Sequence, residues 1–100
     1  MTMERTIKRT KNYTIFERAY EGQKLTFRRW HSGEVDIMFD DTFAKACGYC
    51  SAADMVNTTI GEQGKQEIIS RCGYLPSWVR VMDDGKVYFV GETLDVIGEA

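Results

Sequence analysis

Three cysteines and a single histidine are the residues of this sequence best suited to metal or redox chemistry. Cys47 and Cys50 have the C-x-x-C spacing of a redox pair or of half a zinc site, and Cys72 with His31 would complete a Cys₃His ligand set. A redox pair needs its first cysteine at the N-terminus of a helix, where the dipole lowers the thiol pKa, but Cys47 is expected at a helix end. No second pair has zinc-finger spacing. We therefore expect structural or incidental cysteines, with no metal and no cofactor.

Groups for acid–base or nucleophilic catalysis are equally sparse. A Ser-His-Asp or Cys-His arrangement would have to use His31, which falls in an expected turn without suitable neighbours. The acidic pairs Asp40-Asp41 and Asp83-Asp84 are better explained by a helix cap and a tight turn than by an acid–base pair or a cation site. No glycine-rich phosphate loop is present, because Gly61–Gly64 lacks the following Lys-Ser/Thr. We expect no enzyme.

Positive charge is concentrated at the start of the chain, although the net charge is −2. Residues 1–29 contain eight Lys and Arg against three acids, whereas residues 30–100 contain five against twelve. This asymmetry predicts a basic stripe that attracts phosphates or an acidic protein surface, with a solvated face as the plain alternative. Rings and charges are interleaved at Phe27, Arg28, Arg29 and Trp30. If the rings face outward, such a strip can stack bases and hold phosphates. If the rings face inward, they belong to the core of a hairpin and only the arginines face water.

Two β-hairpins are predicted by alternating apolar residues around turn signals. Residues 25–30 and 35–39 flank His31-Ser-Gly33, and residues 78–82 and 87–90 flank Asp83-Asp-Gly-Lys86. Tyr13–Phe16 is a further short strand, and Leu94, Val96 and Ile97 are typical of the start of a last helix.

Three helices are expected between the hairpins. The first, residues 41–47, is capped by Asp40 or Asp41 and stopped by Gly48; the second, residues 51–60, starts at Ser51; the third covers residues 65–72. The first two, joined by about three residues, have the lengths of a helix-turn-helix, with packing alone as the other interpretation. In that motif the second helix would present Ser51, Asn57 and Thr58 to bases or phosphates, and Arg80 and Lys86 on the later hairpin would act as a wing.

The chain as a whole suits one small domain. It has 100 residues and is 43% apolar, has one proline and no repeat, and contains no apolar run near the ~20 residues that cross a bilayer. Residues 1–11 are expected to form a flexible basic arm, and residues 12–100 a mixed α+β domain with two hairpins and three to four short helices, including the helix-turn-helix-like pair. The odd cysteine count and the lack of a secretory signal predict a cytoplasmic protein.

Two runs resemble a known family. Val35-Asp-Ile-Met-Phe-Asp-Asp-Thr-Phe-Ala-Lys-Ala-Cys-Gly-Tyr49 is similar to the signature of the BRO-type antirepressor N-terminal domain of phages and baculoviruses, which has a strand, an Asp that opens a helix, and a closing Gly-Tyr. Gly85-Lys-Val-Tyr-Phe-Val-Gly-Glu-Thr-Leu94 is similar to that family's later strand and helix start. The resemblance implies a small α+β DNA-binding module of phage or mobile-element origin, usually at the front of a transcription regulator.

We therefore expect a phage or mobile-element regulatory domain that binds DNA through the helix-turn-helix-like pair. The alternative is an acidic module that binds a repressor or inhibits a host nucleic-acid machine by occupying its basic groove. Either function is compatible with a homo-oligomer and needs no membrane. The residues expected to bind nucleic acid are Arg28, Arg29, Ser51, Asn57, Thr58, Arg80 and Lys86.

Overall fold

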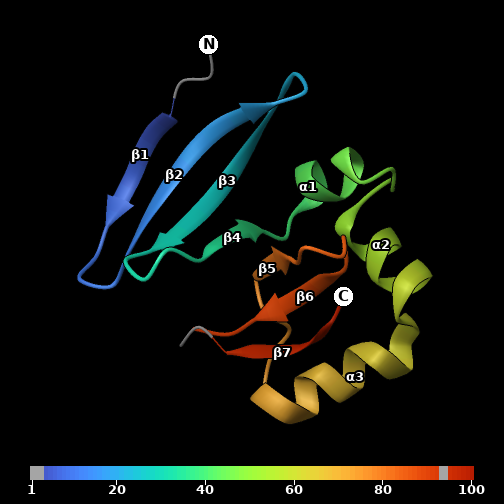
Figure 1. The fold of residues 1–100 in the computed structure, drawn as a ribbon. Coiled ribbons are helices and arrows are strands. Elements are labelled where there is room, and N and C mark those ends of the chain that lie inside the picture. The colour runs from blue at the N-terminus through green and yellow to red at the C-terminus, as the bar shows by residue number, and fades with distance from the viewer. Residues whose placement is uncertain (1–3, 93–94) are drawn as a thin grey trace.

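The computed structural model describes residues 4–92 and 95–100. Its strands form one antiparallel sheet in which seven strands follow one another in chain order, and three helices stand between the fourth and fifth strands (Figure 1). The elements are β1 (Glu4–Arg9), β2 (Tyr13–Tyr20), β3 (Gln23–Trp30), β4 (Val35–Met38), α1 (Asp41–Ala46), α2 (Ala52–Thr59), α3 (Gly61–Cys72), β5 (Trp78–Val81), β6 (Val87–Val90) and β7 (Val96–Glu99).

The predicted α+β class is wrong, because the molecule is mostly sheet. The two predicted hairpins exist as β3–β4 and β5–β6, but they are joined by β4–β5 pairing into one sheet and extended by further strands at both edges. Sequence periodicity reports the faces of a single strand and says nothing about which distant strands pair. The three helices are therefore an insertion into a continuous meander of strands.

The flexible arm predicted for residues 1–11 is also wrong where the structure describes it. Glu4–Arg9 forms β1 and pairs antiparallel with β2, with an irregularity between Thr6 and Lys8. Every β1 residue is exposed, so the strand has no apolar alternation by which a sequence could reveal it. Its pairing instead satisfies the backbone groups that β2 would otherwise leave at the sheet edge.

The predicted C-terminal helix is replaced by β7. Val96–Glu99 pairs with β6, while Leu94 lies outside the described residues. Gly98 lies opposite Phe89 and against α3, where an added Cβ would come within 2.5 Å of Ile68 Cδ1. The strand therefore approaches the helix closely because residue 98 has no side chain.

The helix ends follow their local signals. Asp40 accepts a hydrogen bond from Phe43 N at 2.9 Å, and Ser51 Oγ accepts one from Asp54 N at 3.0 Å, so both act as N-caps. Gly48 has a φ of 96°, as expected for a residue that ends a helix in the left-handed conformation. The third helix begins four residues before the predicted start, at Gly61.

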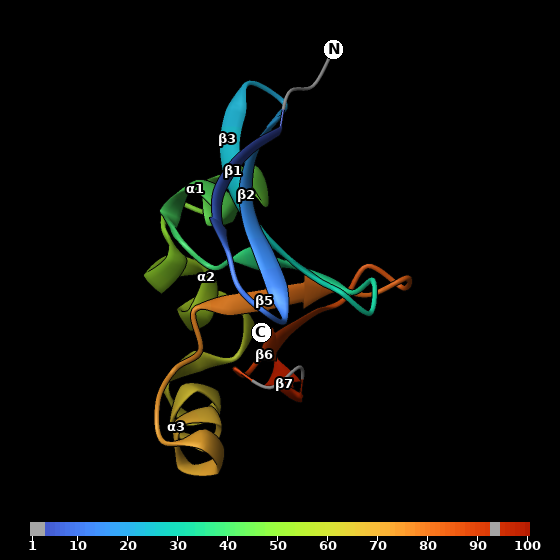
Figure 2. The ribbon, with the colours of Figure 1, turned by 90° about the vertical axis from the view of Figure 1, so that its left-hand side faces the viewer.

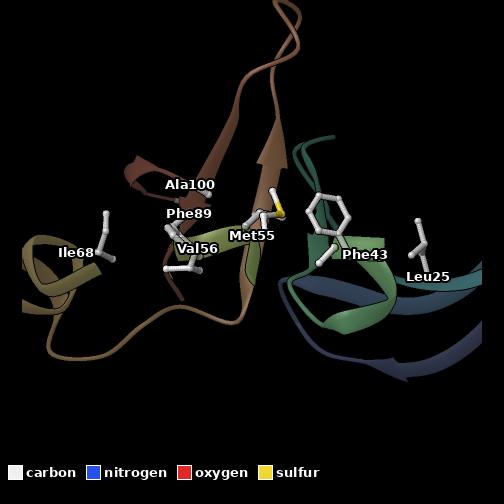
Figure 3. Packing of buried hydrophobic residues seen from close by; sticks show 9 residues of the cluster. Leu25, Phe43, Met55, Val56, Ile68, Phe89 and Ala100 are labelled. Carbon is white, nitrogen blue, oxygen red and sulfur yellow. The ribbon is translucent and has the colours of Figure 1, made fainter. Parts of the chain in front are cut away.

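The core lies between one face of the sheet and the three helices (Figure 3). Ile37, Val79 and Phe89 are direct cross-strand neighbours on β4, β5 and β6, so they share that face. Helix residues that are buried against it or beside it are Phe43, Ala44, Met55, Val56 and Ile68. The helices therefore cover β3–β7 on one side only.

The first three strands form a long ribbon that projects from the rest of the molecule (Figures 1 and 2). β2 and β3 pair over eight residues, whereas β4 pairs only with Phe27–Arg29, near the end of β3. The opposite end, with the β2–β3 turn, extends beyond β4 and the later strands. We call residues 4–30 the ribbon and the remaining described residues, 31–92 and 95–100, the body.

Candidate nucleic-acid interface

Arg28, predicted to contact nucleic acid, is instead fully buried beside Asp36. Both residues are 0% exposed, and they are direct partners across β3 and β4 on the sheet face opposite the helices. Arg28 Nε and Nη2 donate hydrogen bonds to Asp36 Oδ2 over 3.1 and 2.9 Å, and Trp30 Nε1 donates to the same oxygen over 2.7 Å. The carboxylate therefore neutralises an arginine that has no access to solvent.

Arg80 supplies a second cation to the same carboxylate. Its Nε donates to Asp36 Oδ1 over 2.8 Å, and Nη2 lies 2.8 Å from that oxygen without the geometry of a hydrogen bond. The Arg80 side chain is 15% exposed, so it lies at the margin of the cluster. The predicted wing function of Arg80 would require breaking this ion pair.

Aromatic rings enclose the Arg28 guanidinium. Its Cζ lies 4.7 Å from the Trp30 ring centroid, 4.6 Å from that of Trp78 and 5.6 Å from that of Tyr13. Nη2 also donates to the Gly91 carbonyl over 3.1 Å. We call these three rings the aromatic box. They exclude water from the guanidinium and thereby strengthen its ion pair with Asp36, so this cluster is a structural element of the sheet.

The other predicted contacts remain on the surface but do not form one site. Arg29 is exposed, pairs with Glu4 at 2.9 Å and stacks its guanidinium 4.4 Å from the Phe16 ring centroid. Ser51 is committed to the α2 cap, while Asn57 and Thr58 are exposed on α2. That helix carries no Lys or Arg. The helix-turn-helix-like pair therefore offers bases two polar side chains but offers phosphates little positive charge.

Most of the exposed cations instead lie on the ribbon. Seven of its eight Lys and Arg are exposed, with Arg28 the exception, against three acids. Two are paired, Arg5 with Glu17 at 2.8 Å and Arg29 with Glu4. The five ribbon cations without an ion pair in the described structure are Lys8, Arg9, Lys11, Arg18 and Lys24.

Four of these five cations lie on strands and are divided between the two faces of the ribbon, while Lys11 lies in the connection between β1 and β2. Lys8 and Lys24 are opposite Ile15 and Ala19, whereas Arg9 and Arg18 are opposite Thr14 and Leu25. Because alternate residues point to opposite faces, the two pairs belong to different faces. None of the five was predicted to bind nucleic acid, although the charge asymmetry of the sequence contained the signal. Lys8, Arg9 and Lys11 fall in the predicted arm, and Arg18 and Lys24 fall outside the predicted strands 13–16 and 25–30, so the sequence predicted no surface that joins them.

The cysteines have no partner that would make them a site. Cys47, Cys50 and Cys72 are free, and no group of metal-ligating side chains occurs among residues 4–92 and 95–100. Desolvation raises the pKa of the Cys47 thiol, which is the opposite of what a redox nucleophile requires. His31 is exposed in the β3–β4 turn.

Comparisons with family models, curated proteins and solved structures found no match for this chain. Within the described residues, no helix is long and apolar enough to cross a membrane.

Proposed function

We propose that this chain is a DNA-binding domain whose contact surface is the ribbon. The observation that carries the proposal is the concentration of seven exposed cations on a projecting element, five of them outside any described ion pair. Phosphate neutralisation by Lys and Arg supplies most of the non-specific affinity of proteins for DNA. The projecting ribbon can reach a duplex without bringing the acidic body against it.

A β-ribbon also suits the shape of DNA. The major groove admits an α-helix or a β-ribbon, and strands serve as the reading element in several DNA-binding folds. Cations on both faces of the ribbon suit a position between the two phosphate backbones that border a groove. The resemblance of residues 35–49 and 85–94 to BRO-type antirepressor domains supports the same class of ligand and a regulatory function in a phage or mobile element.

Salt-dependent binding to a labelled 20-base-pair duplex tests this proposal by fluorescence anisotropy. Five phosphate contacts predict that log Kobs falls with log[salt] at a slope of about −4.5, since each contact contributes about −0.9. The double variant Arg18→Ala, Lys24→Ala should bring the slope to about −2.7. Absence of binding at low salt would overturn the proposal.

A matched control separates the ribbon from the helix pair. Lys45 on α1 and Lys86 in the β5–β6 turn are exposed, and replacing both by Ala changes the net charge by the same amount as the ribbon variant. We expect this control to bind DNA with the unaltered slope. An equal or larger loss in the control would place the interface on the helix pair and the later hairpin.

A further inference from the structure

The free end of the ribbon carries a hollow with two aromatic residues in its lining. It lies beside the β2–β3 turn, at the end of the ribbon that extends beyond β4 (Figure 1), and its volume is about 440 Å³. Sites that hold small ligands have volumes in this range. The lining residues are Arg18, Ala19, Tyr20, Glu21 and Phe27. The hollow therefore offers a ligand both flat rings and a cation.

Tyr20 is the aromatic residue of this hollow that is available to a ligand. It is 54% exposed, the highest value among the exposed large apolar residues of the described structure. Within residues 4–92 and 95–100 its side chain forms neither a ring contact nor a hydrogen bond. A large ring that no other part of the chain covers gains the most from a flat partner that removes it from water.

The turn next to Tyr20 fixes its position at the end of the ribbon. Glu21 and Gly22 are the two turn residues, with φ of 50° and 80°, and a type I′ turn requires positive φ at both. This tight connection places Tyr20 directly opposite Gln23. The ring is therefore presented by a paired strand and not by a long loop.

Phe27 and Arg18 share a ribbon face with Tyr20. Tyr20 is opposite Gln23, which lies four residues before Phe27 on the same strand, and Arg18 lies two residues before Tyr20. Because alternate residues of a strand point to the same face, all three side chains are on one side. The Phe27 ring is held by stacking on Phe16, with centroids 5.3 Å apart and planes 13° apart. Phe27 is thus a fixed apolar surface beside the exposed Tyr20 ring.

The charge around the hollow favours an anionic ligand. When the two ion pairs of the ribbon are set aside, five exposed cations and one acid, Glu21, remain on it. Arg18 and Glu21 offset each other within the lining, so the positive excess comes from the rest of the ribbon, including Lys24 directly opposite Ala19. A DNA strand combines flat rings with a row of phosphates. Its bases can reach such a hollow only when they are unpaired, because a duplex keeps them inside the stack.

We propose that this hollow holds one unpaired base of single-stranded DNA, stacked on Tyr20, while Arg18 contacts a phosphate beside that base. This assignment rests on the proposed function, because the neighbouring phosphates of the strand bind the same ribbon cations. Stacking on an aromatic side chain accepts any base, since every base has a π-face. The ribbon then binds the phosphates of single-stranded and duplex DNA alike, and Tyr20 adds affinity for the single strand alone.

Fluorescence anisotropy with a labelled 20-nucleotide single strand and a 20-base-pair duplex tests this assignment. We expect Tyr20→Ala to weaken single-strand binding about fivefold or more, the effect of losing one stacking ring. Its salt slope and its duplex affinity should be unchanged, because no charge is removed. Tyr20→Phe keeps the ring and should bind as the parent does. Tyr74→Ala removes an exposed tyrosine from the body, so it is the matched control and should bind both probes normally.

An abasic single strand of the same length separates stacking from phosphate contact. The parent should bind it more weakly than the normal strand, and Tyr20→Ala should cause no further loss with this probe. Unaltered single-strand binding in Tyr20→Ala, or an equal loss with the duplex, would overturn the assignment of the hollow and leave the ribbon as the DNA-binding surface. No binding of either probe by the parent at low salt would overturn the proposed function as well.

Discussion

Arg28 Nη2 donates a hydrogen bond to Asp36 Oδ2 over 2.9 Å, and both side chains are completely excluded from solvent. Asp36 also accepts from Arg80, which lies 44 positions later in the chain. One carboxylate therefore joins β3, β4 and β5 on the sheet face that the helices leave open. Arg28 and Arg80 therefore join strands of this sheet, and the DNA binding that we propose uses other cations.

Removing the Asp36 carboxylate should destabilise the fold strongly. Asp36→Leu removes the buried counter-charge of Arg28 and leaves it only the exposed Glu92, 3.8 Å from its Nη1; removing one partner of a buried ion pair costs about 3–5 kcal/mol. The double variant Arg28→Met, Asp36→Leu should recover part of this loss, because Arg80 can turn its charge toward water. Guanidinium unfolding monitored by circular dichroism measures both. Asp83→Ala, in the exposed β5–β6 turn, should stay within about 0.5 kcal/mol of the parent.

If the double variant were less stable than Asp36→Leu alone, the attribution of the loss to an unpaired buried charge would be wrong. The aromatic box around Arg28 would then be the more important contribution.

The effects of substitutions at Gly98 and Ile68 on stability should depend on each other, because the two residues are in contact and share limited space. Gly98→Ala places a methyl group 2.5 Å from Ile68 Cδ1, and overpacking of this kind costs about 1–3 kcal/mol. Ile68→Val removes that Cδ1 atom and alone costs about 0.5–1.5 kcal/mol. The double variant should be more stable than the sum of the two single losses predicts. Thermal unfolding of the four proteins gives the coupling, and strict additivity would rule out direct contact in solution.

Gly91→Ala is the control for this series. Its added methyl group would meet Ile97 Cδ1 at 3.4 Å, at the edge of an ordinary contact. We expect a smaller loss than for Gly98→Ala, since less of the neighbouring structure has to move.

Ser51 should affect stability without affecting DNA contacts. Its Oγ caps α2 through Asp54 N, and loss of an N-cap oxygen costs about 0.5–2 kcal/mol. Ser51→Ala should therefore lower the unfolding free energy by about 1 kcal/mol and leave the salt slope of DNA binding unchanged. Thr58→Ala, exposed in the same helix, should be neutral or slightly stabilising because Ala favours helix. If the Ser51→Ala protein were as stable as the parent but bound DNA less well, Ser51 would belong to the DNA-binding surface.

The β3–β4 turn should respond to acid through Glu34. A hydrogen bond from Ser32 Oγ, and next the Glu34 backbone N–H, lower the pKa of the Glu34 carboxyl below its ordinary value. A depressed folded-state pKa means that the stabilisation is present above the ordinary Glu pKa and is lost as pH falls through the folded-state value. Because Glu34 is exposed, the effect on stability is small, and NMR titration of its side-chain carboxyl is the suitable measurement.

Ser32→Ala should raise the pKa of Glu34 toward its ordinary value. Ser70→Ala, on α3, removes a hydroxyl that bonds the Glu67 carbonyl far from this turn and should leave the Glu34 titration unchanged. An unaltered Glu34 titration in Ser32→Ala would show that the hydroxyl is not the cause.

Sequence alone determined those features whose interacting groups are close in the chain. Asp40 and Ser51 cap helices through amides three residues away, and the Asp-Gly turn and alternating strands specify the β5–β6 hairpin. The charge asymmetry was equally visible in the sequence. These signals are local because the atoms that satisfy them are separated by only a few bonds.

Only the tertiary structure decided which strands join and which cations face water. β1 has no apolar pattern and exists because it pairs with β2; β7 runs against α3 because Gly98 has no side chain. Arg28 and Arg29 are adjacent in sequence, yet Arg28 is buried beside Asp36 and Arg29 is exposed. The reason is that successive residues of a strand point to opposite faces of the sheet, and each face has different neighbours. Those neighbours come from segments distant in the chain, so the division of the arginines into structural and surface charges follows from how the strands pair in space.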